Sequence, residues 1–504
     1  MQGIDHFLDE GFIRPTLDWH ALAPELTFLA VGAILTLIDV IWLEKGRKYM
    51  PALAGIGLLI TLVPILTLAI DGNERVLWDG AFVVDEFALV MKALFLISGY
   101  VVVLLSANYI AEGDYWENEY YGLFAASLMG MVLMASARDL VTIFIALELL
   151  SLPIYMMASW RKRSLESNEA GMKYFLMGVF ASAVVLYGMS LLYGVSGSTK
   201  LEDIGAAVGA MDGSIPIITL GVVFVIVGFA FKVSAVPFHV WAPDTYQGAP
   251  TPVTAFLAVA SKTAGFVALI QLILVGFYDR SDVYAPLLWV LAIASMTIGN
   301  LIALRQTNIV RMFAYSGVAQ AGYMLAALAV VGTSPEVGQQ ALSAVVTYLI
   351  IYAAMNLGAF AVIHAVARKT RSGEISSYGG LFTYAPGLAV AMVIFLFSLT
   401  GIPPLGGWYA KLVVVQATVS DGTWFGYSLA IAVAVNSVIA AFYYANIARL
   451  MFMSEAPDGD TTPIRVPFAL TAALTITVIA TVVTGVLPGL VGTLAEANLI
   501  AFGG

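Results

Sequence analysis

The chain has 504 residues, of which 60% are hydrophobic and 11% are charged, whereas soluble proteins carry about a quarter charged residues. The formal net charge of −10 argues against nucleic acid as a partner, because a face that binds nucleic acid is expected to be basic. The absence of cysteine excludes disulfides, cysteine-ligated zinc and protein-ligated iron–sulfur clusters. The composition therefore predicts an all-α polytopic membrane protein.

Apolar runs close to the 20 residues needed to cross about 30 Å of hydrocarbon recur along the chain. The runs start near Pro24, Pro51, Glu86, Tyr121, Asp139, Asn168, Ile215, Thr251, Ala285, Arg311, Leu342, Phe382, Trp424 and Val466. We therefore predict about fourteen transmembrane helices. The segment up to His20 lacks the order of a cleavable signal, so the first span is expected to direct the chain to the membrane.

Lysine and arginine are unevenly distributed between alternate connections. With the N-terminus outside, the inner connections hold fourteen of the 23 basic residues, the outer ones hold five, and four lie within spans. Because cytoplasmic loops hold most of the basic residues, we expect both termini on the non-cytoplasmic side of a bacterial cell membrane. The polar stretches 71–85 and 196–214 are expected to cap the outer face, and 454–462 is expected to be an acidic inner loop.

Two of the predicted spans are interrupted by proline. The seventh breaks at residues 235–237 and the twelfth at residues 401–407, five spans later. Lys232 precedes the first break and Lys411 follows the second. Two interrupted spans at corresponding positions indicate inverted repeats around an ion path, and lysines on opposite flanks of their breaks fit inversion. The predicted parts are 1–120 (spans 1–3), a five-helix repeat in 121–280 (spans 4–8), a second in 281–453 (spans 9–13), and 454–504 (span 14).

Four ionisable residues lie deep within the predicted spans: Glu148, Lys232, Lys262 and Lys411. A charge at this depth costs at least a few kcal/mol and usually marks an ion path. The alternative for Lys232 is that its long side chain reaches an interface, which its aromatic surroundings and the nearby break disfavour. A carboxylate favours the charged form of a neighbouring lysine. A Glu148–Lys232 pair would thus be a switch whose separation changes the proton affinity of the lysine.

Several other polar residues have two interpretations. His239 lies in the first break, where an imidazole can relay protons or can cap the interrupted helix. Tyr315, Gln320 and Asn436 can hold water in a path, although such residues more commonly make hydrogen bonds that pack helices.

Three further charged residues lie nearer the ends of spans. Lys92 is close enough to the start of the third span to reach the outer interface, and Glu25 and Asp39 are expected to be interfacial, with a partner role as the alternative for Glu25. No Walker, Rossmann or heme-attachment pattern is present, so we expect no cofactor on this chain.

Four stretches together resemble the antiporter-like subunits of proton-translocating NADH:quinone oxidoreductase, respiratory complex I. They read GFAFKVSAVPFHVWAPDTYQGAPTPVTAFLAVASK, ALELLSLPIYMM, RMFAYSGVAQAGYML and GIPPLGGWYAKL, and the similarity runs from about Arg138 to Lys411. The PDTYQGAP form, the lysine at 411 and the end after the fourteenth span are closer to the N type of subunit than to the L and M types.

The resemblance implies a role for each buried ionisable residue. Glu148 would pair with Lys232, Lys262 would connect, and Lys411 would be the terminal lysine toward the outer exit. Gln320 stands where many relatives carry a histidine, so water held by Gln320 would substitute there. NADH, FMN, iron–sulfur clusters and quinone are implied in partner subunits, which would include related antiporter-like chains.

Two alternatives remain at this point. The chain also resembles the D-type component of multi-subunit sodium/proton antiporters, which shares the fold and the buried lysines. In a scaffold role, by contrast, the lysines would fix helix packing and carry no protons.

Overall fold

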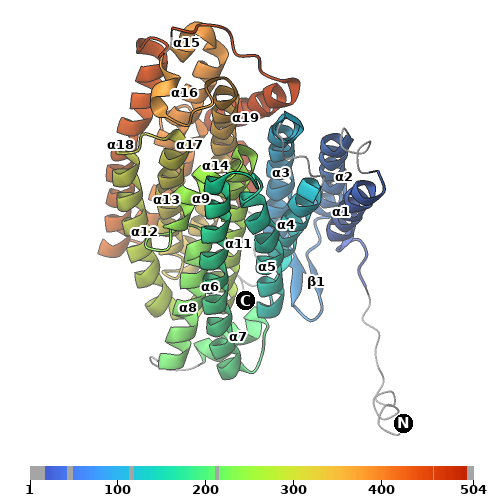
Figure 1. Ribbon diagram of the computed structural model, residues 1–504. Coiled ribbons are helices and arrows are strands. Elements are labelled where there is room, and N and C mark those ends of the chain that lie inside the picture. The colour runs from blue at the N-terminus through green and yellow to red at the C-terminus, as the bar shows by residue number, and fades with distance from the viewer. Residues whose placement is uncertain (1–16, 43–48, 113–118, 211–214, 458, 497–504) are drawn as a thin grey trace.

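The computed structural model describes residues 17–42, 49–112, 119–210, 215–457 and 459–496 (Figure 1). Both chain ends, on which the predicted sidedness of the termini depends, lie outside these ranges. The first helices are α1 (Ala23–Ile41), α2 (Met50–Asp71), α3 (Glu86–Glu112), α4 (Glu119–Ser136), α5 (Leu140–Ala158), α6 (Leu165–Ser196) and α7 (Leu201–Gly209).

The middle of the chain holds the first broken helix and a nearly continuous buried one. These are α8 (Pro216–Lys232), α9 (Trp241–Gly248), α10 (Thr251–Phe256), the π-helical turn η3 (Leu257–Ser261), α11 (Lys262–Gln271), the π-helical turn η4 (Leu272–Gly276) and the short 3-10 helix η5 (Tyr278–Arg280).

The remaining helices are α12 (Ser281–Ala303), α13 (Ile309–Leu328), α14 (Pro335–Thr370), η6 (Ile375–Tyr378), α15 (Leu381–Tyr384), α16 (Pro386–Thr400), α17 (Gly406–Ser420), α18 (Trp424–Met453), α19 (Phe468–Val486) and α20 (Pro488–Ala495). The long helices lie roughly parallel (Figure 1). In the described part of the chain, ten helices are long and apolar enough to cross a membrane: α1, α2, α3, α5, α6, the helix from α10 to η4, α12, α14, α18 and α19. The chain is thus mostly helical, as expected of a polytopic membrane protein.

A small β-hairpin corrects the all-α prediction. Strand β1 (Arg75–Leu77) pairs antiparallel with β2 (Phe82–Val84), so that Arg75 faces Val84. The turn between them holds Asp79 and Gly80 at positive φ, and an Asp-Gly pair flanked by β-branched and aromatic residues favours a hairpin. The polar character of this stretch predicted a loop and concealed the local strand signal.

The hairpin covers the same end of the bundle as the segment around α7. Asp79 in its turn forms an ion pair with Lys200, and the backbone N–H of Arg138 donates to the carbonyl of Ala81 at 2.9 Å. The stretch 71–85 and the described residues 196–210 therefore lie side by side, as expected for two caps of one face. Among the connections predicted to be inner, Lys369 donates to the carbonyl of Thr462 at 2.7 Å, which joins the basic end of α14 to the acidic loop after α18.

Both predicted interruptions are confirmed. Helix α8 ends at Lys232 and α9 begins at Trp241, while α16 ends at Thr400 and α17 begins at Gly406. Proline has no backbone N–H to continue a helix, and the backbone groups released at each break find partners. The N–H of Val236 donates to Ser295 Oγ at 2.9 Å. The second break uses a serine in the same way, since the N–H of Gly407 donates to Ser398 Oγ at 2.9 Å.

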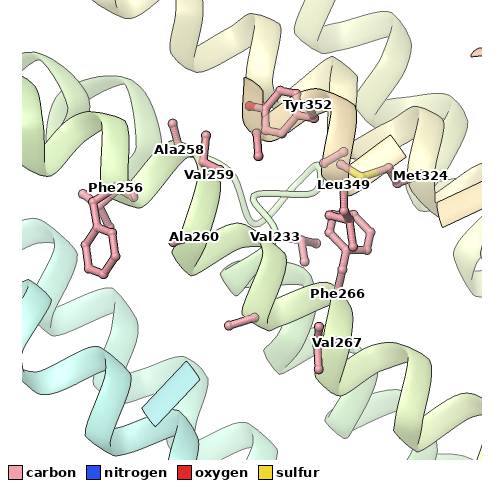
Figure 2. Close-up of a cluster of buried hydrophobic side chains, with 14 of the residues drawn as sticks. Val233, Phe256, Ala258, Val259, Ala260, Phe266, Val267, Met324, Leu349 and Tyr352 are labelled. Atoms are coloured by element: carbon pink, nitrogen blue, oxygen red, sulfur yellow. The ribbon is translucent and has the colours of Figure 1, made fainter. Parts of the chain in front are cut away.

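The helix from α10 to η4 lies at the centre of the bundle. Within its most apolar window 94% of the residues are buried, compared with 22% for α1. Figure 2 shows Phe266 of this helix beside Leu349 of α14, and the ring of Phe256 lies 4.8 Å from that of Phe124 on α4. A helix that is apolar on every side is buried within protein. The segment that carries Lys262 is therefore enclosed by other helices on all sides.

Candidate functional site: a row of buried lysines

Lys232 ends helix α8 inside the protein and does not reach an interface. Its side chain is 3% exposed, and its Nζ donates a hydrogen bond to Ser151 Oγ of α5 at 2.8 Å. The rings of Tyr155 and Tyr174 lie nearby, with centroids 5.9 and 5.8 Å from Nζ. Aromatic faces stabilise a cation through their negative quadrupole. The ammonium is therefore held by one hydroxyl and two rings.

Glu148 lies one turn before Ser151 on α5 and is close enough to act on the Lys232 ammonium through its charge. The two groups make no direct ion pair in this conformation. Oε1 of Glu148 is buried and accepts no hydrogen bond from any described residue. The Ser151 hydroxyl stands at the ammonium instead, and it donates to the carbonyl of Leu147. The structure therefore shows the predicted pair separated, with a serine at the lysine.

Lys262 begins α11 immediately after the π-helical turn η3 and is 2% exposed. Its Nζ donates to the carbonyl of Gly317 on α13 at 2.7 Å. A Cβ at position 317 would lie 3.1 Å from that Nζ and 3.3 Å from the hydroxyl of Tyr352. A side chain at this position would therefore press against both groups and would require them to shift. Single π-helical turns occur often at functional sites, and this one directly precedes the lysine.

Lys232 and Lys262 are neighbours across the contact between α8 and α11. Gly265, one turn after Lys262, lies so close that a Cβ there would be 3.3 Å from the Cβ of Lys232. A small residue at a helix contact lets the backbones approach closely. The two lysines are thus brought together by tertiary packing of segments about thirty residues apart.

Lys411 lies on α17 and points back to the second break. Its side chain is 7% exposed. Its Nζ donates a hydrogen bond at 2.8 Å to the carbonyl of Thr400, which is the last residue of α16. The carbonyls at a helix C-terminus lack helical partners and carry partial negative charge. The ring of Tyr323 on α13 lies 4.5 Å from the same Nζ.

One face of α13 joins the central lysine to the terminal one. Gly317, Gln320 and Tyr323 follow each other at intervals of three residues, so they share this face. Gln320 donates to the carbonyl of Leu399 at 3.2 Å and accepts a hydrogen bond from the Tyr348 hydroxyl. Gln320 therefore packs helices together, as the alternative interpretation predicts, and it does so between Lys262 and Lys411.

The other auxiliary residues divide into two groups. Tyr315 is half-buried on α13 and its ring centroid lies 6.1 Å from that of His239 in the first break. Nδ1 of His239 is buried and has no hydrogen-bond partner among the described residues. Asn436 takes part in packing, because its carbonyl accepts a hydrogen bond from Asn300 at 3.1 Å and its amide donates to Ala432.

A buried ion pair lies outside the row. Nζ of Lys92 lies 2.6 Å from Oε1 of Glu25, and both residues are buried, at 0% and 4% exposed. The pair supports the partner role that was the alternative for Glu25, and both side chains are covered by protein where α1 and α3 contact α2 and α4. Their positions in the sequence could have indicated the pair. Glu25 and Lys92 carry opposite charges, and both lie near the predicted outer ends of their spans.

Asp244 in the PDTYQ stretch was not singled out by the sequence pattern. Its carboxylate accepts from Lys173 of α6 and from Arg311 of α13, both at 2.7 Å, and Arg311 also donates to Gln247 at 3.0 Å. The short helix α9 is therefore tied to two long helices by charge. The available signal was that Asp244 is acidic and that Lys173 and Arg311 are predicted to lie at the inner side, where a carboxylate could pair with them.

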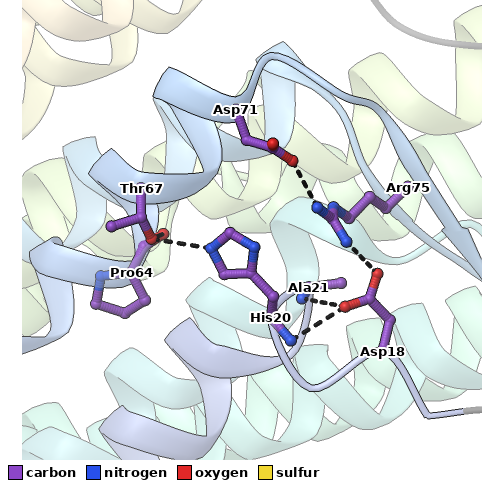
Figure 3. Close-up of polar contacts among 7 residues, drawn as sticks. All are labelled: Asp18, His20, Ala21, Pro64, Thr67, Asp71 and Arg75. Carbon is purple, nitrogen blue, oxygen red and sulfur yellow. Dashed lines mark hydrogen bonds and ion pairs between the residues drawn. The ribbon is translucent and has the colours of Figure 1, made fainter.

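The turn before α1 is fixed by a polar cluster at the end of α2 (Figure 3). Asp18 accepts the backbone N–H groups of His20 and Ala21 at 3.0 Å each and pairs with Arg75, which also contacts Asp71 at 2.5 Å. The backbone N–H of Ala21 and the Arg75 guanidinium hold the pKa of Asp18 below its ordinary value.

A chain of helices with broken spans and a row of buried lysines is the architecture of an ion-translocating membrane protein. Residues 137–440 match the family described as NADH:quinone oxidoreductase/Mrp antiporter, TM. NADH-quinone oxidoreductase subunit N of Trichlorobacter lovleyi is 38% identical over 459 residues, which are 90% of this chain and 92% of the relative. The same subunit of Rubrobacter xylanophilus is 41% identical over 435 residues, 86% and 88% of the two chains.

Solved structures agree with these relatives. A chain of respiratory complex I from Thermus thermophilus is 30% identical, with a TM-score of 0.78. The match covers 94% of this chain and 100% of the Thermus chain. A chain of the Mrp complex from Dietzia sp. DQ12-45-1b shares the fold, with a TM-score of 0.83 at 21% identity over 95% and 96% of the chains. The chain belongs to the NADH-quinone oxidoreductase subunit N family.

Proposed function

We propose that this chain is a proton-translocating membrane subunit of a respiratory NADH:quinone oxidoreductase. The observation that carries the proposal is the row of three buried lysines, Lys232, Lys262 and Lys411, with the half-buried Glu148 before them, within a chain of the subunit N family. A buried charge without a structural ion pair is costly, and among the described residues none of these three lysines forms a direct ion pair with a carboxylate.

In this mechanism protons reach Lys232 and Lys262 from the cytoplasm, pass along the face of α13 to Lys411, and leave on the outer side. Glu148 gates the first step by moving toward or away from Lys232. The serine contact supports two positions for the ammonium, because Ser151 and Glu148 lie one turn apart on α5. Tyr315 and His239 serve as auxiliary members that hold water or a proton beside the row. Gln320 is the third auxiliary residue, and beside its packing contacts with Leu399 and Tyr348 it would hold water between Lys262 and Lys411.

The energy comes from quinone reduction elsewhere in the assembly. Moving one charge against 100 mV costs about 2.3 kcal/mol, and the opening and closing of a buried ion pair is large enough to exchange this amount. NADH, FMN, iron–sulfur clusters and quinone belong to partner subunits in this proposal. The partners are other membrane and peripheral subunits of the complex, including related antiporter-like chains.

The proposed architecture has fourteen crossings and two inverted five-helix repeats. Two breaks, five spans apart, support the repeats, and each predicted apolar run coincides with a helix or a broken pair of helices. The repeats would occupy 121–280 and 281–453, between spans 1–3 in 1–120 and the last span in 454–504. An even number of crossings would leave both termini on one side of the bacterial membrane, and the excess of basic residues in the inner connections favours the non-cytoplasmic side.

The test is the replacement of Glu148 or Lys232 by alanine in the assembled complex. We expect NADH-driven proton uptake into inverted vesicles to fall by at least about tenfold, since one missing member interrupts the row. The amount of complex in the membrane is measured in parallel. Unimpaired pumping in both variants would contradict the assignment, and loss of assembly with normal pumping per complex would favour the scaffold role.

The second candidate is the D-type component of a multi-subunit sodium/proton antiporter, which the shared fold of the Mrp chain supports. Copurification after mild detergent extraction separates the two. Partners that carry flavin and iron–sulfur clusters support the oxidoreductase. Small antiporter subunits with sodium-dependent exchange would support the rival.

A further inference from the structure

A group of buried tyrosines from three helices lies between Lys262 and Lys411. Its members are Tyr323 of α13, Tyr348 and Tyr352 of α14, and Tyr444 of α18, and each is at most 1% exposed. The hydroxyl of a tyrosine both donates and accepts hydrogen bonds, and it commonly has a partner when it is buried. The group therefore brings several hydroxyls into the interior of the bundle beside the lysine row.

One end of the group lies beside Lys262. A Cβ at Gly317 would lie 3.1 Å from the Lys262 Nζ and 3.3 Å from the Tyr352 hydroxyl, so both groups come close to the same point on α13. The preceding residue, Ser316, shares a buried hydrogen bond with the Tyr444 hydroxyl. Hydroxyl groups from α13, α14 and α18 therefore meet next to the central lysine.

The other end of the group meets Lys411 at the second break. Gln320 donates to the carbonyl of Leu399 at 3.2 Å, and Lys411 donates to the carbonyl of the next residue, Thr400, at 2.8 Å. The amide oxygen of Gln320 accepts a hydrogen bond from the Tyr348 hydroxyl. The Gln320 side chain and the terminal lysine thus bind neighbouring carbonyls at the end of α16, and the Tyr348 hydroxyl is bonded to the same amide.

Tyr444 and Tyr348 join these two ends. Ser316 and Gln320 lie four residues apart on α13, so their side chains are neighbours on one face of the helix. Tyr444 is close enough to interact with Gln320 as well as with Ser316, and it acts on the Tyr348 hydroxyl through charge. The ring of Tyr348 stacks on that of Tyr323 with centroids 6.4 Å apart, and Tyr323 is the ring that faces the terminal lysine. The contacts therefore run without a break in the packing from one lysine to the other.

We propose that the hydroxyls of Tyr444 and Tyr348 pass the proton from the central lysine to the terminal one. Ser316 and Gln320 position these hydroxyls. This inference rests on the proposed function of the lysine row. Residues 316–323 of α13 include no charged side chain, so hydroxyls are the groups along this face that can take up and release a proton, as tyrosine does in acid–base chemistry.

The transfer needs no other reactant. In each step a hydroxyl oxygen receives a proton from one side and releases its own proton to the other side. One O–H bond forms as another breaks, so the hydroxyl is regenerated and one positive charge moves on. The lysine amine at the start loses a proton, the lysine amine at the end gains one, and nothing is oxidised or reduced.

The experiment compares the assembled complex carrying the native chain with a Tyr348→Phe/Tyr444→Phe double variant. Phenylalanine keeps each ring, and so keeps the packing, but has no proton to pass. Proton uptake per NADH oxidised is measured in inverted vesicles, and the thermal midpoint is measured on the purified complex. We expect uptake by the double variant to fall by at least about tenfold, since a positioned acid–base group contributes about 10²- to 10⁴-fold to a proton transfer. Each single variant should lose less.

A second buried tyrosine–serine pair supplies the matched control. The hydroxyl of Tyr120 on α4 shares a hydrogen bond of 2.9 Å with Ser106 on α3, both side chains are at most 1% exposed, and neither belongs to the lysine row. Tyr120→Phe therefore removes a hydrogen bond of the same kind between two helices, and uptake should stay unchanged. Equal losses of uptake in this control and in the double variant would overturn the proposal. So would a loss in the double variant that comes with a larger fall in thermal midpoint than the control shows, because the tyrosines would then serve packing.

Lys262→Ala in the same assay separates this inference from the function on which it rests. If Lys262→Ala stops pumping and the double variant pumps normally, the tyrosine route is wrong and the lysine row stands. If both pump normally, the proposed function itself is contradicted and the tyrosine route falls with it. Loss of uptake in Lys262→Ala and in the double variant, with normal uptake in Tyr120→Phe, supports the route.

Discussion

The two broken helices hold their lysines in opposite ways. At the first break, Lys232 is bound by a side-chain hydroxyl, that of Ser151, with the Glu148 carboxylate close by. At the second, Lys411 is bound by the main-chain carbonyl of Thr400 and the face of Tyr323. A side-chain partner can change position by bond rotation, whereas a carbonyl at the end of a helix is fixed by the main chain. In the proposed mechanism, the first break is therefore the gate and the second holds its lysine in one place.

The largest effect on pumping is expected when Lys411, the lysine at the second break, is removed. In a Lys411→Ala variant we expect proton uptake per NADH oxidised to fall by about tenfold or more, because the row then ends before the second break. Uptake is measured in inverted vesicles with equal amounts of complex. The matched control is Lys369→Ala, which removes a lysine near the end of α14 that lies outside the row. Normal pumping by the Lys411 variant would show that the second break carries no protons.

Lys92 is a buried lysine that lies outside both breaks. Replacing it tests whether burial alone makes a lysine necessary for pumping. Replacing Lys92 by alanine leaves the buried Glu25 carboxylate without its partner at 2.6 Å, which destabilises a protein by about 3–5 kcal/mol. We expect a lower thermal midpoint and less assembled complex, with normal pumping per complex that remains. A Lys92→Ala/Glu25→Ala double variant should recover much of the stability. If the assembled single variant pumps poorly, Lys92 belongs to the proton path.

The contact of Ser151 with Lys232 tests whether the two lysines depend on different kinds of partner. Ser151→Ala removes the hydroxyl that binds Lys232, at a cost of about 1 kcal/mol, and we expect pumping to slow by about fivefold. Thr400→Ala keeps the main-chain carbonyl that binds Lys411 and should have no effect. The measurement is the rate of proton uptake by both variants under equal NADH oxidation. Equal rates in the two variants would mean that the hydroxyl plays no part in the gate.

The smallest effect is expected at the polar cluster before α1, which lies outside both breaks. Since the pKa of Asp18 is lowered in the folded chain from its ordinary value of 3.8, its contribution to stability is present above that value and is lost as the pH falls through the folded pKa. Asp18→Asn should therefore slightly increase hydrogen exchange of the Ala21 amide near neutral pH, with the difference disappearing in acid below the folded pKa. Proton uptake should be unchanged. A difference that persists in acid would show that the Asp18 charge does not fix this turn.

Particular residues show how far sequence patterns reach. The two breaks were predicted because proline within an apolar run disrupts helical hydrogen bonding, and Lys232, Lys262 and Lys411 were selected because charge is rare in spans. The β-hairpin at 75–84 was missed, since a polar connection was interpreted as a loop although it contains an Asp-Gly turn. The pairing of Lys92 with Glu25 was not predicted, because depth along a helix does not say which neighbour covers a residue.

The contacts of the row illustrate the same limit. The Ser151 hydroxyl at Lys232, the Gly317 carbonyl at Lys262 and the Thr400 carbonyl at Lys411 all come from other helices than the lysines they bind. Two of the three are main-chain groups, which every residue possesses, so no residue type marks them. The resemblance implied a Glu148–Lys232 pair that opens and closes, and it did not indicate the serine that contacts the lysine in this conformation.

By itself, the amino-acid sequence determined that this is a polytopic helical membrane protein with two interrupted spans and a small set of buried charges. Composition and hydrophobic length are sufficient for this, because the bilayer penalises polar groups along each span separately. Only the tertiary structure decided which groups hold each lysine, that α13 joins Lys262 to Lys411, and that Lys92 is paired with Glu25. Those contacts depend on how the helices pack against one another, and the hydrophobicity of a single helix contains no information about its neighbours.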